Sequence, residues 1–112
     1  MNSKEWISEW NNLFPSNIKW NGVNIKSRDE DCEKRMNDFL KRYPEYSKET
    51  IFKATKTYLE KQKNENWNYT KRSVYFIGKK GEPSLLSSYC EAIENKPEET
   101  EISINNFYNN FI

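Results

Sequence analysis

The sequence predicts a compact, mainly helical domain of four helices with a small β-hairpin near the N-terminus. Apolar residues recur at helical spacing in several segments that capping residues and prolines bound. An Asn-Gly pair at residues 21–22 lies between two short segments with strand character, which is typical of a hairpin. The mean hydropathy of -1.10 and the 31% of charged residues would suit a disordered chain, but 15% of the residues are aromatic and can supply a core.

The first helix is expected over residues 3–14. Asn2 can cap this helix, Glu5 has the position of a capping-box carboxylate, and Pro15 ends it. Its apolar stripe consists of Trp6, Trp10, Leu13 and Phe14.

The hairpin is expected over residues 18–25, because Asn-Gly suits the two positive φ angles of a type I′ turn. A two-residue turn fixes the register and places four apolar side chains on one face of the hairpin. These form the cross-strand pairs Trp20–Val23 and Ile18–Ile25. Since an isolated hairpin is marginal in water, we expect this face to pack against helices.

Two further helices follow, joined by a short connection around Pro44 that makes them neighbours. Ser27 begins the second helix with a capping-box pattern, and Ser47 caps the third. The apolar stripe of the second is Cys32, Met36, Phe39, Leu40 and Tyr43. That of the third is Ile51, Ala54, Thr55, Tyr58 and Leu59.

Residues 70–77 fit two helical turns or a strand, and we expect a helix with the strand as the alternative. A turn over residues 78–83 precedes a last helix over residues 84–95, with apolar positions at Leu85, Leu86, Tyr89, Cys90 and Ile93. The expected core is Trp6, Trp10, Trp20, Phe39, Leu40, Ile51, Tyr58, Leu59, Phe76, Leu86 and Ile93.

The composition argues against an enzyme. The chain has no histidine, which excludes Ser-His-Asp and Cys-His catalysis, and its three glycines are isolated, so no glycine-rich phosphate loop exists. Cys32 and Cys90 occupy apolar helical positions and are expected to be buried free thiols. The acidic cluster at residues 29–33 is explained by the dipole of the helix that it begins. We therefore expect no catalytic site, no metal and no cofactor.

The first ten residues are polar and lack the apolar segment of a signal peptide. No segment of the sequence has the length and hydrophobicity of a membrane-spanning helix. We therefore expect a cytoplasmic protein that does not interact with membranes.

The charge is unevenly distributed between a domain over residues 1–96 and a tail over residues 97–112. The tail has three glutamates and no basic residue, while the other 18 basic and 14 acidic residues give the domain a net charge of +4. An acidic spacer over residues 97–101 precedes apolar residues at helical spacing, the format of ligands that bind as a helix in a groove. These candidate partner-binding residues are Ile104, Phe107, Tyr108, Phe111 and Ile112. The alternative is that these side chains close the core of the domain.

The paired aromatic and apolar residues of the tail, Phe107-Tyr108 and Phe111-Ile112, resemble the terminal peptides by which replication and transcription factors hold a sliding clamp. The glutamine or acidic residue of those peptides is not in register here. The resemblance implies a protein partner rather than a substrate.

A second candidate site combines basic and aromatic residues, which together can hold single-stranded nucleic acid through phosphate contacts and stacking. Its residues are Trp67, Tyr69, Lys71, Arg72, Lys79 and Lys80. The alternative is a half-buried element with solvated lysines. The second and third helices could also form a helix-turn-helix that presents Lys48, Lys53 and Lys56 to DNA.

Two segments of the chain are CEKRMNDFLKRYPEYSKETIFKATKTYL, over residues 32–59, and YFIGKKGEPSLLSSYCEAI, over residues 75–93. Both resemble small uncharacterised accessory proteins of tailed phages. The second segment also resembles the ends of some phage replication accessory proteins. The resemblance implies a phage protein that acts in the host cytoplasm, and it transfers no site residue.

Together these observations predict a non-enzymatic adaptor or inhibitor that docks on a replication, transcription or host-defence protein through its C-terminal tail. The alternatives are a small nucleic-acid-binding protein that uses residues 67–80 and an oligomeric virion component. The sequence leaves the oligomeric state open.

Overall fold

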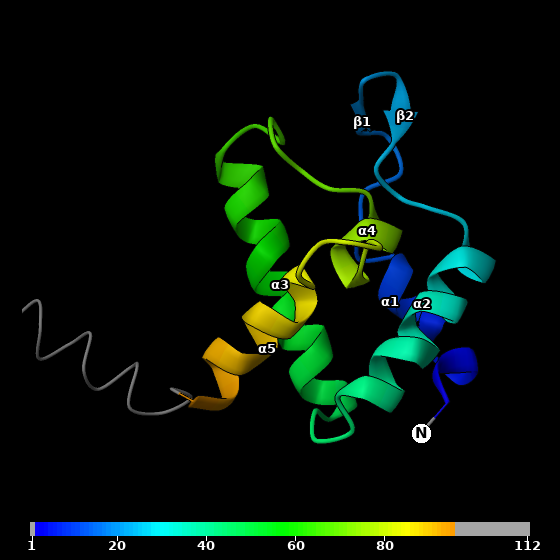
Figure 1. The fold of residues 1–112 in the computed structure, drawn as a ribbon. Coiled ribbons are helices and arrows are strands. Elements are labelled where there is room, and N and C mark those ends of the chain that lie inside the picture. Colours follow the sequence, from blue (N-terminus) through cyan, green and yellow to red (C-terminus); the bar gives the residue numbers. More distant parts are fainter. Residues whose placement is uncertain (1, 96–112) are drawn as a thin grey trace, which may run out of the picture.

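The computed structural model describes residues 2–95 and confirms a mainly helical fold with a small antiparallel hairpin near the N-terminus (Figure 1). These residues form five α-helices rather than four, because the ambiguous segment is a short helix. The elements are the 3₁₀ helix η1 (Ser3–Glu5), α1 (Ile7–Asn11), β1 (Lys19–Trp20), β2 (Val23–Asn24), α2 (Asp29–Arg42), α3 (Lys48–Asn64), α4 (Ser73–Ile77) and α5 (Leu85–Asn95).

The core joins two groups of helices. α3 packs along α5, α2 packs against α1, and the short α4 contacts both α2 and α5 (Figure 1). Phe76 of α4 is fully buried at this junction, with its ring centroid 4.4 Å from that of Tyr58 and 6.1 Å from that of Phe14. α4 therefore links the two groups through an aromatic cluster.

The N-terminal helix is broken at Trp6, whose φ of -131° is not helical, so the prediction of one helix over residues 3–14 was wrong. Asn2 caps η1 as expected and accepts a hydrogen bond from the Lys4 amide at 2.8 Å. The amide and hydroxyl of Ser3 both donate to Asn37 Oδ1 of α2, at 2.9 and 2.7 Å. These bonds fix η1 on α2, and the chain turns at Trp6 before α1 begins.

The hairpin has the predicted register, with Trp20 opposite Val23 and positive φ angles of 53° at Asn21 and 79° at Gly22. Only its base packs against the helices: Ile25 is fully buried, but Trp20 is 47% exposed and Val23 45% exposed. Figure 1 shows the hairpin extending beyond the helices. The expectation that Trp20 belongs to the core was therefore wrong.

The capping-box pattern predicted that Ser27 caps α2, and this prediction was wrong. The N-cap of α2 is Arg28, one residue later, and its side chain makes no capping bond. The Ser27 hydroxyl instead accepts from the Val74 amide at 3.2 Å, and the Ser27 amide donates to Ser73 Oγ at 2.8 Å. Ser27 thus provides an acceptor for an amide in the first turn of α4, whose own N-cap residue, Arg72, makes no side-chain capping bond.

The third and last helices follow their sequence patterns. Ser47 caps α3 by accepting from the Thr50 amide at 3.1 Å, and all five predicted apolar-stripe residues of α3 are buried. Ser84 accepts from the Ser87 amide at 3.1 Å and donates to the Ile77 carbonyl at 2.6 Å, which joins α4 to the start of α5. Within α5 Leu86 is fully buried, whereas Ile93 is only half-buried, so it lies at the edge of the core.

Candidate functional site

The predicted basic and aromatic set is divided in the structure. Trp67 is half-buried against the core, at a positive φ of 62°, and its amide donates to the Gln62 carbonyl at the end of α3. Tyr69 is 81% exposed on the same loop. Lys71 Nζ lies 3.8 Å from a carboxylate oxygen of Glu82.

Arg72, Lys79 and Lys80 lie on a different surface, which includes Tyr75 of α4. The Arg72 guanidinium lies 5.7 Å from the Tyr75 ring centroid, and Lys79 Nζ lies 5.3 Å from it. Both distances are within the range of cation–π interactions. Arg72 Nε also donates to the Asn24 carbonyl of the hairpin at 3.3 Å. The half-buried Tyr75 ring therefore lies beside two cationic side chains.

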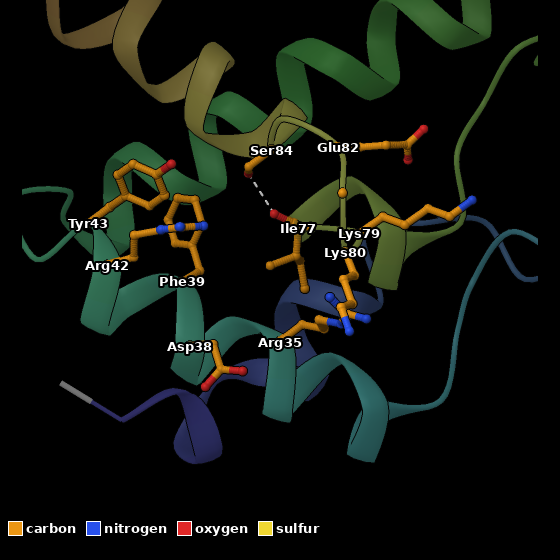
Figure 2. A pocket seen from close by; sticks show the side chains of 12 residues that line it. Arg35, Asp38, Phe39, Arg42, Tyr43, Ile77, Lys79, Lys80, Glu82 and Ser84 are labelled. Atoms are coloured by element: carbon orange, nitrogen blue, oxygen red, sulfur yellow. Dashed lines mark hydrogen bonds between the residues drawn. The ribbon is translucent and has the colours of Figure 1, made fainter.

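A cleft of about 390 Å³ lies between α2 and the segment that joins α4 to α5. Figure 2 shows Arg35, Asp38 and Arg42 extending from α2 on one side, and Lys79, Lys80 and Glu82 on the other. Phe39, Tyr43 and Ile77 supply apolar lining. The dashed bond in Figure 2, from Ser84 to the Ile77 carbonyl, fixes the wall at the start of α5.

A second depression, of about 450 Å³, continues this surface along α2, because Arg35 and Asp38 line both. Arg72 and Tyr75 lie in the second depression. We call the two depressions together the α2–α4 face. Its charged side chains are six basic and three acidic residues: Lys34, Arg35, Arg42, Arg72, Lys79 and Lys80, with Asp31, Asp38 and Glu82.

Two of the three acidic residues form ion pairs with basic residues that do not belong to the α2–α4 face. Asp31 lies 3.3 Å from Arg28, and Glu82 pairs with Lys71. Among residues 2–95, none of the six basic side chains lies within 4 Å of a carboxylate oxygen. The α2–α4 face is therefore a site of net positive charge.

The sequence analysis did not predict that charged residues of α2 line this face, although their spacing along the helix indicates it. Asp31, Arg35, Asp38 and Arg42 are spaced at i, i+4, i+7 and i+11, which places them on one side of a helix. The predicted basic and aromatic set lies within residues 67–80, so it includes residues that flank α4 but none of α2.

The helix-turn-helix hypothesis finds little geometric support. α2 packs mainly on α1 and α4, and α3 packs on α5, so the two helices diverge from their short connection (Figure 1). Lys48 Nζ lies 3.7 Å from a carboxylate oxygen of Glu9 in α1, whereas Lys53 and Lys56 are exposed on α3.

The two cysteines are buried and free, as the sequence predicted. Burial raises the pKa of Cys32 to about 11 and that of Cys90 to about 12. Both thiols are therefore protonated near neutral pH, and a protonated thiol is a poor nucleophile. Within residues 2–95 no three side chains of the metal-ligating types gather in one place.

The predicted partner-binding residues of the tail lie outside the described residues. They are Ile104, Phe107, Tyr108, Phe111 and Ile112. The described part of the chain contains no helix with the length and apolar character needed to span a bilayer.

No family model, curated protein or solved structure matches this chain. The resemblance to phage accessory proteins therefore stays a prediction.

Proposed function

We propose that the protein is a non-enzymatic adaptor that docks on a protein of replication, transcription or host defence through its C-terminal tail. One observation carries the proposal: residues 6–90 supply a core of nineteen buried apolar side chains. The domain thus has its own aromatic cluster, which supports a role for the apolar residues of the tail in binding a partner rather than in closing the core.

The chemistry of the tail suits a groove on another protein. Its five apolar residues recur at i, i+3, i+4, i+7 and i+8, so a helix formed on binding would present them on one face. Burying each such side chain contributes about 1.5–3 kcal/mol. The three glutamates of the spacer would favour a partner with a basic rim, because charge complementarity speeds association. The resemblance to clamp-binding peptides makes a sliding clamp the most specific candidate partner.

The test is the double variant Phe107→Ala with Phe111→Ala. We expect it to weaken binding by a hundredfold or more, because aromatic anchors at the centre of an interface each contribute about 2 kcal/mol or more. Capture from host extract, followed by calorimetry with the purified partner, measures this change. The thermal midpoint of the domain should stay constant.

The matched control is Asn105→Ala with Asn109→Ala, which alters the same tail on its polar side. Control binding should equal that of the unmodified chain. Full binding by the double phenylalanine variant would refute the proposal, and so would equal losses in both variants.

A further inference from the structure

We infer that the α2–α4 face binds single-stranded nucleic acid, a second activity separate from the tail. Three features carry the inference: six basic side chains that lack carboxylate partners among residues 2–95, a tyrosine ring beside two of them, and a cleft with apolar lining.

The charge of the face is arranged as a track. Asp31 and Arg42 mark its two ends along α2 and are separated by about 16 Å of helix at 1.5 Å per residue. Lys79 and Lys80 line the opposite wall of the cleft, and Lys80 extends toward Arg35 of α2 (Figure 2). A phosphate backbone that follows this track would stay within a Debye length of several cations, about 10 Å at 0.1 M salt. Such a groove is the electrostatic part of single-strand sites.

The aromatic part of the site is Tyr75. Its ring lies beside Arg72 and Lys79 and lines the second depression, where a base could stack against it. Stacking on an aromatic side chain tolerates every base, because each base has a π-face. The bases of a duplex are already stacked on one another, so a single strand suits this ring better.

The remaining acidic residue distinguishes nucleic acid from an acidic protein. Asp38 lines both depressions and offers an acceptor next to the cationic track. A carboxylate there would accept a hydrogen bond from an exocyclic amino group of a base, as acidic residues do for cytosine. The carboxylates of an acidic peptide offer it no such donor and are repelled by it. The cleft volume of about 390 Å³ is within the range of small-ligand sites, about 300–1,000 Å³.

The test measures the anisotropy of a fluorescent single strand of about 15 nucleotides over a salt series. Binding should weaken with a slope of log K against log salt of about -3 to -4, as expected for four to six phosphate contacts on a single strand. The variant Arg35→Gln with Lys80→Gln should lower affinity tenfold or more and reduce that slope by about 1.4.

The matched control is Lys53→Gln with Lys63→Gln, which removes the same charge from exposed positions on α3. It should change affinity less than threefold. A second variant, Tyr75→Leu, should weaken binding about 5- to 100-fold, while Tyr75→Phe keeps the ring and the affinity.

Three results would overturn the inference. The first is no binding of the strand at about 50 mM salt, where phosphate contacts are strong. The second is equal weakening by the Arg35–Lys80 variant and its control, which would indicate attraction to net charge alone. The third is displacement of the strand by polyglutamate at equal charge concentration, which would indicate a site for acidic proteins. The thermal midpoint of each variant shows that the fold is retained.

Discussion

Replacing Trp10 by alanine is expected to cost about 3–5 kcal/mol of the free energy of unfolding, the range for deleting a large buried aromatic side chain. Trp10 is fully buried, and its ring lies 5.3 Å from that of Phe14. Its indole Nε1 donates to Thr55 Oγ1 at 2.8 Å, a buried bond between α1 and α3. The loss is large against a total stability of about 5–15 kcal/mol for a domain.

Trp20→Ala is the control for this prediction, since the sequence placed both tryptophans in the core. Because Trp20 is 47% exposed at the hairpin tip, we expect its removal to cost less than about 1 kcal/mol. Urea unfolding followed by circular dichroism measures both changes. Equal losses for the two variants would contradict the hairpin position described above.

Phe76→Ala is expected to have the second largest effect, also about 3–5 kcal/mol. The Phe76 ring stacks on Tyr58 and lies 6.2 Å from Tyr89, so the substitution would remove the centre of the aromatic cluster. α4 has only five residues and cannot be stable on its own, so its position depends on this side chain.

Phe52→Ala is the comparison for Phe76→Ala. Phe52 is half-buried on α3, with its ring 5.7 Å from Trp6, and we expect about half the loss or less. The same urea titrations apply. If Phe76→Ala were no more damaging than Phe52→Ala, α4 would not be the link between the two groups of helices.

The elements that the sequence predicted well are those whose cause is local. α3 and α5 have serines at their starts and an apolar stripe, and both features lie within the segment itself. The hairpin register follows from the Asn21-Gly22 turn, which needs no distant partner. In these cases the interactions within the segment are sufficient to determine its secondary structure.

The failures have tertiary causes. Ser27 has a capping pattern for α2, but its hydroxyl bonds to Val74, which is 47 residues away. Trp20 has an apolar position in the hairpin, but the hairpin extends beyond the helices that would cover it. Neither the distant amide nor the reach of the hairpin is visible in a local pattern.

The candidate site was predicted in part for the same reason. Lys79 and Lys80 were found because they are adjacent in sequence, while Arg35 and Arg42 reach the same cleft only through the packing of α2 on α4. Trp67, predicted in the same set, is half-buried against the core and does not line this cleft. The sequence pattern therefore predicted the basic residues between α4 and α5, whereas those of α2 are brought to the cleft only by the tertiary fold.

We propose that the domain folds without the tail, whose apolar residues serve a partner. Thermal unfolding of the full chain against a chain that ends at Lys96 tests this claim most directly. We predict midpoints that agree within about 3 °C, less than the shift of roughly 4–8 °C that 1 kcal/mol produces in a domain of this size. A drop of 10 °C or more would contradict the account, because it would mean that the tail completes the core.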